Sequence, residues 1–275
     1  RIHKKPGQFL LSGSVRFTSR DAIRESLTGR IMNLELLPFS IPELLGEPLP
    51  HICFEALRAN HFNHFLNAFP YQQSQCQKIH KEIPRYLEFG GLPSVCFLRD
   101  EKLRVQKINE QLQTILDRDI RLVKKILTAY SDIRRLTECL AMSQGEPLDF
   151  TNLKKQTGLA TPTIKKIIYA LEAVFMIRVF RIEGSTMGSV VFFEDQGEQR
   201  VLSDEKSLSI KNWIHLVFTN VRHQFEYRLG ETYRMFQYRT RGGACVPICF
   251  STPSGILGIL PILKGEDYQQ VRGSI

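Results

Sequence analysis

Two pairs of lysines offer the clearest chemistry in the sequence. Lys154 and Lys155 close one stretch of helical spacing, and Lys165 and Lys166 lie near the start of the next. Over residues 150–181 six basic side chains stand against a single acidic one. Gathered ammonium groups bind phosphate oxygens, and the side chains between them can reach base edges. This pattern favours double-stranded DNA as the partner.

A helix–turn–helix followed by a strand is the expected support for these lysines. Helical spacing covers residues 150–157 and about 162–175, and Gly158 begins the turn between them. Thr161 suits the N-cap of the second helix, because its hydroxyl can accept an amide of the first turn. Alternation over residues 176–182 predicts a strand, so the order is that of a winged helix-turn-helix. The expected DNA contacts are Lys154, Lys155, Thr163, Lys165, Lys166, Tyr169 and Arg178.

Two functions for this segment stay open. The second helix carries few Arg, Asn or Gln residues that could read bases, so DNA contact should be mostly with the backbone, salt-sensitive and weakly sequence-specific. Many winged helices instead dock proteins, for instance in a homo-oligomer, and their lysines are simply solvated.

Composition supports a basic, water-soluble protein. The chain has 275 residues, 43% of them hydrophobic and 24% charged, and a net charge of +9. Two or three domains are expected for this length, and the positive charge favours polyanionic partners. No apolar run approaches the roughly 20 residues that cross a bilayer, so we expect no membrane association. Six cysteines in so long a chain do not resemble a disulfide framework, which favours reduced thiols and a cytoplasmic location.

Catalytic motifs are missing from the sequence. No Gly-x-Ser-x-Gly, His-Glu-x-x-His or Cys-x-x-Cys occurs. Cys245 and Cys249 are the one close cysteine pair, and no second pair completes a zinc site. We therefore expect no metal and no catalytic residue in this chain.

The rest of the chain divides by its spacing. Residues 8–35 read as strand, helix and strand, with buried apolar positions at residues 8–11 and an alternating strand at residues 30–36. Residues 40–130 are mostly helical, with a break after Gly46, and the charges of residues 99–135 are expected to form a solvated helix surface. The segment from residue 189 onward reads as a strand, a helix and a three-stranded meander.

Five short motifs occur along the chain in one order. They are Phe9-Leu10-Leu11-Ser12-Gly13-Ser14, then Ser26-Leu27-Thr28-Gly29-Arg30 with the strand after it, then Gly90-Gly91-Leu92-Pro93, Leu116-Asp117-Arg118-Asp119-Ile120, and Phe192-Phe193-Glu194-Asp195-Gln196-Gly197. Their order resembles a family of predicted prokaryotic AAA+ ATPases. Members of that family join a P-loop domain to a winged helix and a carboxy-terminal domain of restriction-endonuclease-like fold.

The resemblance implies a nucleotide site that this chain does not complete. Ser12 or Ser14 matches the sensor position, and Arg30 matches a finger-like position. The chain has no Gly-x-x-x-x-Gly-Lys-[Ser/Thr] and no Gly-Lys dipeptide, so nothing cradles the phosphates. We expect that the P-loop part lies upstream of Arg1 or has been lost. ATP and Mg²⁺ are therefore expected only for a longer protein, in which this chain would supply the sensor and the finger.

The endonuclease-like resemblance also lacks its metal ligands. In the alignment that it implies, the acidic positions fall on Cys245, Pro247 and Ile262, and only Lys264 is retained. Cys, Pro and Ile supply no oxygen ligand for Mg²⁺. Asp195, an isolated acid at a strand end, does not restore the site. We expect an inactive nuclease-like domain.

These observations predict a multi-domain protein of α/β and α+β class. The expected domains are a partial AAA+ α/β unit (residues 1–45), a helical lid (46–130), a winged helix (131–184) and a small restriction-endonuclease-like α/β domain (185–275). The expected function is that of a non-catalytic binding module, a remnant or carboxy-terminal part of such an ATPase. The alternatives are a contribution to ATP hydrolysis by a full-length protein or oligomer, and a protein-docking role.

Overall fold

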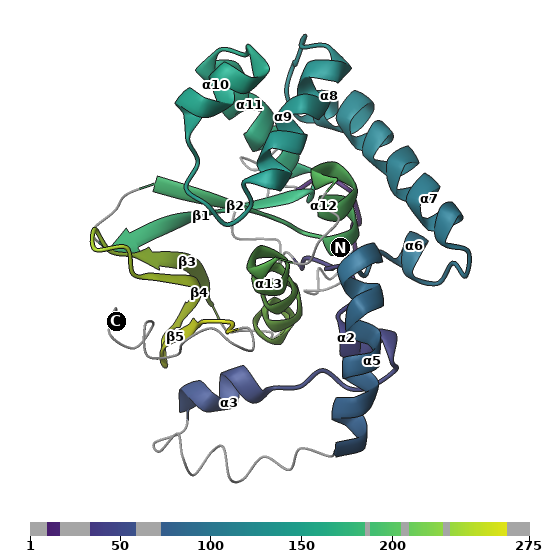
Figure 1. Ribbon diagram of the computed structural model, residues 1–275, viewed down its shortest axis with the longest axis vertical. Coiled ribbons are helices and arrows are strands. Elements are labelled where there is room, and N and C mark those ends of the chain that lie inside the picture. Colours follow the sequence, from purple (N-terminus) through teal and green to yellow (C-terminus); the bar gives the residue numbers. More distant parts are fainter. Residues whose placement is uncertain are drawn as a thin grey trace, which may run out of the picture.

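The chain is mixed α/β, with helices packed around one five-stranded sheet (Figure 1). A computed structural model describes residues 10–16, 34–58, 73–184, 188–204, 209–227 and 232–262. Within these residues no helix is long and apolar enough to cross a membrane.

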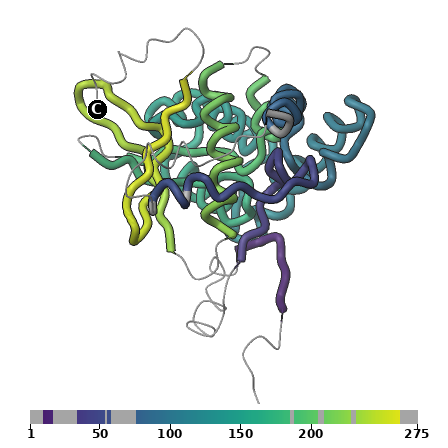
Figure 2. The backbone as a smooth tube through the Cα atoms, turned by 90° about the horizontal axis from the view of Figure 1, so that it is seen from below, coloured from purple at the N-terminus to yellow at the C-terminus, as the bar shows by residue number. Residues whose placement is uncertain are grey.

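The first described helices are short and lie along the body of the protein. Helix α2 (Ile41–Leu44) begins with a capping box, in which the amide of Ser40 donates to Oε2 of Glu43 at 2.8 Å. Helix α3 (Ile52–Arg58) follows the expected break and contacts α13 (Ile210–Glu226) and β5 (Gly255–Ile259). Figure 2 shows this part of the chain crossing the molecule toward the carboxy-terminal strands.

The predicted helical region contains a long, nearly continuous helical segment, residues 101–123, which we call the rod. Helices α5 (Gln73–Phe89) and α6 (Pro93–Cys96) precede α7 (Glu101–Thr114), which continues through a π-helical turn, η2 (Ile115–Asp119), into α8 (Ile120–Val123). Ile108, Leu112 and Leu116 are fully buried and form the apolar side of this segment.

Three helices and a hairpin follow. Helix α9 (Tyr130–Met142) leads to α10 (Phe150–Thr157) and α11 (Thr161–Ala173), close to the predicted spans. The predicted N-cap of α11 was wrong by one residue. The carbonyl of Ala160 already accepts the amide of Ile164 at 3.0 Å, so Ala160 is the cap and Thr161 is the first helical residue.

The sheet has the order β2-β1-β3-β4-β5. Strands β1 (Ile177–Gly184) and β2 (Gly188–Phe193) form an antiparallel hairpin, and β1 pairs in parallel with β3 (Arg234–Arg239). Strands β3, β4 (Cys245–Thr252) and β5 form the predicted antiparallel meander. One sheet therefore crosses the expected domain boundary after residue 184.

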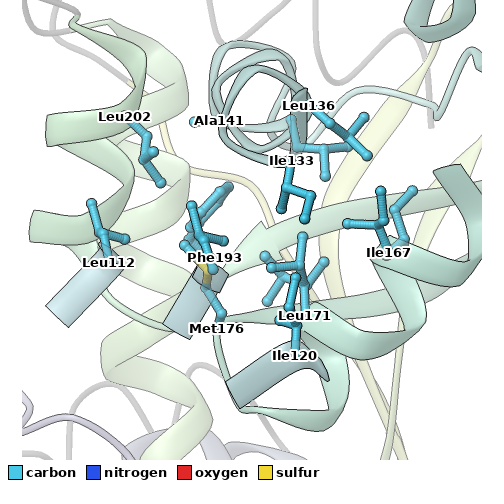
Figure 3. Close-up of a cluster of buried hydrophobic side chains, with 14 of the residues drawn as sticks. Leu112, Ile120, Ile133, Leu136, Ala141, Ile167, Leu171, Met176, Phe193 and Leu202 are labelled. Carbon is cyan, nitrogen blue, oxygen red and sulfur yellow. The ribbon is translucent and has the colours of Figure 1, made fainter. Parts of the chain in front are cut away.

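Both faces of β2 are buried from Val190 to Phe193, because two cores meet there. Val191 and Phe193 pack with α7, α9, α11 and α12 (Gln196–Ser203) in the larger core, part of which is drawn in Figure 3. Val190 and Phe192 face the other way and pack with Phe218 of α13. This double burial explains why β2 reads as a continuous apolar run.

The two strands expected near the amino terminus are not seen in the described residues. Leu10 and Leu11 are 94% and 60% exposed and belong to no strand. Residues 34–36 are also outside any strand, and Glu35 rather than the neighbouring leucines turns inward, toward arginines. Charge pairing with distant residues outweighs the local alternation here. The rest of this predicted strand–helix–strand segment lies outside the described residues, namely residues 8–9 and residues 17–33, which include Arg30.

Candidate nucleic-acid interface

Local signals fix the two helices that carry the lysines. The carboxylate of Asp149 accepts the amides of Thr151 and Asn152 at 2.9 and 3.0 Å, which caps α10. Gly158 ends α10 with a φ of 73°, a conformation that favours glycine. The face of α11 formed by Ile164, Ile167 and Leu171 is fully buried. Burial of this stripe fixes which side of α11 meets solvent.

The four predicted lysines lie on the exposed sides of these helices. Lys154, Lys155, Lys165 and Lys166 are exposed, and Thr163 is half-buried. Tyr169, one turn further along α11, is 40% exposed. Six of the seven predicted contact residues are therefore on α10 and α11, and the lysines are accessible to a large anion.

Few other groups compete for these ammonium groups. Within the described part of the chain, none of the four lysines forms a salt bridge. Lys165 lies 5.2 Å from the centre of the Phe150 ring, and Lys166 donates to the carbonyl of Lys125. Glu172 is turned away, because its carboxylate accepts the amide of Val179 at 3.0 Å. The positive charge of this surface is therefore uncompensated by any described carboxylate.

Arg178, the seventh predicted DNA residue, lies elsewhere. Its guanidinium pairs with Glu35 and, at 3.1 Å, with Glu194, and only 15% of its side chain is exposed. A contact with DNA would require breaking these pairs. The prediction that Arg178 joins the lysines is therefore corrected: it belongs to a separate group of charges.

That group, the arginine cluster, consists of Arg16, Glu35, Arg178, Glu194 and Arg222. Arg222 is 1% exposed; it pairs with Glu194 and, at 2.9 Å, with Glu35. Burial alone would raise the pKa of Glu194, but the three arginines outweigh it and lower that pKa. Because every charge has a partner, the cluster holds residues 34–36 against the sheet and is best understood as structural.

The predicted nucleotide-associated residues do not gather cations. Ser12 and Ser14 are exposed, and Arg30 is not among the described residues. Ser14 borders a hollow of about 450 Å³. Among the described residues that line it, Lys107 is the one cation, and its Nζ lies 3.6 Å from Oε2 of Glu110. The described lining of this hollow does not resemble a phosphate cradle.

The predicted nuclease-like residues do not form one site. Asp195 follows Phe193, which pairs with Ile177 at the start of β1, whereas Cys245 pairs with Arg239, beside the end of β1 at Gly184. The two ends of β1 are roughly 23 Å apart at the usual rise of a strand. Asp195 and Cys245 therefore lie near opposite ends of β1 and share no site.

Other residues of that group have structural places. Pro247 is buried in β4, where the register with β3 shifts; such a bulge accommodates a residue that lacks an amide proton. Ile262 is 39% exposed at the end of the described chain, and Lys264 lies beyond it. No group of three or more metal-ligating side chains occurs among the described residues.

Asp195 caps α12 and ties it to a distant turn. Its carboxylate accepts the amides of Gly197 and Gly91, each at 2.8 Å. Burial raises the pKa of Asp195 to about 6, although these amides favour the ionised form. Two motifs of the sequence, Gly90-Gly91-Leu92-Pro93 and the strand end at Asp195, thus form one structural joint.

Two further lysines lie beside the interface, and the sequence reasoning missed them. The loop after α8 carries Lys124 and Lys125, and both contact α11. The one hint of them in the sequence is the high density of charged residues over residues 99–135. These charges are expected to form a solvated helix surface, because nothing in the local spacing places this loop next to α11.

Comparison with known protein families gives a match to part of the chain. A family described as a domain of unknown function (DUF8612) is similar to residues 80–190. The matched stretch runs from within α5 into β2 and so contains α10, α11 and the loop with Lys124. No curated protein and no solved structure matches the chain.

Proposed function

We propose that this chain is a non-catalytic module that binds double-stranded DNA through α10 and α11. The observation that carries the proposal is the set of four exposed lysines that no described carboxylate compensates. A surface of this kind attracts phosphates and releases the counterions condensed on DNA.

The arrangement of the elements supports a winged helix. Helices α9, α10 and α11 are followed by the β1–β2 hairpin, and Pro147 forms an isolated antiparallel bridge to Val190, so the chain before α10 pairs with the edge of the hairpin. In a winged helix-turn-helix the second helix of the motif enters the major groove. We assign that role to α11, and the role of the wing to the hairpin.

The chemistry of α11 favours contact with the DNA backbone. Its exposed face offers Thr163, Lys165, Lys166 and Tyr169. Lysines meet phosphates as point charges, whereas base reading relies mostly on the bidentate geometry of Arg, Asn and Gln. The proposal therefore implies weak sequence preference. We further propose that the chain is a remnant or part of an AAA+ ATPase-like protein whose carboxy-terminal region keeps a nuclease-like fold without its metal ligands.

Fluorescence anisotropy with a labelled duplex tests the DNA function. We expect binding at about 50 mM salt that weakens steeply toward about 200 mM. Lys165→Glu with Lys166→Glu should abolish binding. The matched control, Lys78→Glu with Lys102→Glu on α5 and α7, changes the same charge away from α11.

Two outcomes would reject the DNA function. One is the absence of duplex binding at about 50 mM salt. The other is equal loss of affinity in the α11 variant and in its control, which would mean that only net charge matters.

Light scattering tests the alternative function. If the α11 variant dissociates an oligomer that the original protein forms, while its DNA binding is unchanged, α11 is a protein-binding helix instead.

A further inference from the structure

A second basic segment lies directly beside α11. Residues 124–129 connect α8 to α9, and α8 packs against α11. The ammonium group of Lys124 lies 5.4 Å from the centre of the Tyr169 ring. The carbonyl of Lys125 accepts the hydrogen bond from Lys166. Loop and helix therefore present their lysines on one continuous surface, in the group of helices at the top of Figure 1.

Arg121 holds this loop in shape. Its guanidinium donates to the carbonyls of Ile126 at 2.6 Å and Thr128 at 3.1 Å, and to that of Asp117 at 2.7 Å. The Ile126 side chain is 4% exposed and belongs to the larger core. Because the loop is fixed at both points, its lysines are presented in place rather than on a free tether.

The acidic groups near the loop are engaged by arginines. Asp117 lies 3.7 Å from Nη2 of Arg121, and Asp119 accepts from Nε of Arg118 at 2.9 Å. Neither Lys124 nor Lys125 forms a salt bridge within the described chain. Lys125 is exposed and Lys124 is half-buried against Tyr169. The loop thus adds two uncompensated positive charges to the four of α10 and α11.

We propose that the α8–α9 loop is a second phosphate-binding strip, in which Lys124 and Lys125 contact the backbone of the same DNA duplex that α11 binds. This inference rests on the proposed function and extends it beyond the helix-turn-helix. Arg121 is a positioning residue that sets the path of the loop. Tyr169 lies between the two strips and supports the Lys124 ammonium group with its ring.

Salt dependence of duplex affinity tests the loop directly. Each phosphate contact contributes about 0.9 to the slope of log affinity against log salt. This slope is negative, so Lys124→Gln with Lys125→Gln should make it shallower by about 2 and weaken binding at low salt. The control variant, Lys78→Gln with Lys102→Gln, should keep the slope of the original protein. Lys102, in the first turn of α7, lies roughly 30 Å along the rod from the loop.

The outcomes separate this inference from the function on which it rests. If the loop variant binds like the original protein while Lys165→Gln with Lys166→Gln weakens binding, the loop is not part of the interface and the DNA function stands. If the original protein binds no duplex, both fail. A slope change in the loop variant with an unchanged thermal melt supports the proposal.

The role of Arg121 is separated from a simple charge effect by Arg121→Lys. Lysine keeps the charge but lacks the planar fork whose two separate nitrogens reach the carbonyls of Ile126 and Thr128. We expect the negative slope of log affinity against log salt to become shallower, as in the loop variant. A slope equal to that of the original protein would overturn the positioning role.

An anionic membrane is the competing partner of the loop. Leu122 and Leu127 are 63% and 84% exposed next to the lysines, which a bilayer surface would also accept. DNA is favoured because Lys124 and Lys125 lie next to the exposed lysines of α11, so one duplex could contact both sets. In a sedimentation assay with phosphatidylcholine–phosphatidylserine vesicles, we therefore expect no protein to pellet with the vesicles. If the original protein pellets with the vesicles and the variant Lys124→Gln with Lys125→Gln does not, the proposal is overturned in favour of the membrane.

Discussion

The carboxylate of Asp195 accepts the backbone amide of Gly91 at 2.8 Å, although 104 positions separate them in the chain. A side chain at Gly90 would meet that carboxylate, since a Cβ there would lie 2.2 Å from Oδ1. The turn after α5 and the start of α12 are therefore one joint. The helical rod and the sheet are connected through it.

Replacing Asp195 should weaken this joint. Asp195→Ala removes the cap of α12 and leaves the buried amide of Gly91 without an acceptor. Cap loss costs about 0.5–2 kcal/mol and an unsatisfied buried amide about 1–3 kcal/mol. We expect urea unfolding to show a loss of about 2–4 kcal/mol. A loss below about 0.5 kcal/mol, typical of surface substitutions, would contradict the role of this residue.

The buried carboxyl of Asp195 should make stability depend on pH. Burial raises its pKa from 3.8 in the unfolded chain to about 6 in the folded one. The folded state then holds the proton more tightly, so this contribution to stability is complete below about pH 4 and is lost as the pH rises through 6. Asp195→Asn removes the titration, and its unfolding free energy relative to the original protein should rise between these pH values. A difference that is constant with pH would contradict this.

Arg178→Gln separates the arginine cluster from the DNA surface. The substitution leaves Glu35 and Glu194 with fewer partners, and breaking a buried ion pair costs about 3–5 kcal/mol. We expect a loss near the lower end of that range, with an unchanged salt slope of DNA binding. Arg181→Gln, an exposed residue on the same strand, should change stability by less than about 0.5 kcal/mol. A shallower dependence of DNA affinity on salt for Arg178→Gln would mean that this residue does contact DNA.

Gly158→Ala tests the turn between α10 and α11. Nothing lies within 4 Å of a Cβ there, so the cost comes from the φ of +73° alone. A left-handed conformation costs other residues about 1–2 kcal/mol. Thermal unfolding should show a loss of that size, and Gln156→Ala, on the exposed side of α10, should show none. Equal melting temperatures for the two variants would contradict the left-handed conformation of residue 158.

Local signals allowed the helix–turn–helix to be predicted closely. The span of α10 matched residues 150–157 because both of its ends are set by nearby residues, Asp149 and Gly158. The apolar stripe of α11 likewise fixed its buried side. Interactions within a few residues are what a single sequence shows best.

Distant partners decided the features that the sequence did not predict. Glu35 turns inward because Arg16 and Arg222 meet it, and neither is near it in the chain. The parallel pairing of β1 with β3 joins segments that were expected in separate domains. Lys124 reaches the interface only because α8 packs on α11. No local pattern contains this information.

The salt dependence of duplex binding by Lys165→Gln with Lys166→Gln tests the central claim most directly. If the lysines of α11 bind phosphates, the negative slope of log affinity against log salt should become shallower by about 2 than that of the original protein. A slope that stays the same, with affinity unchanged at about 50 mM salt, would show that α11 does not contact DNA.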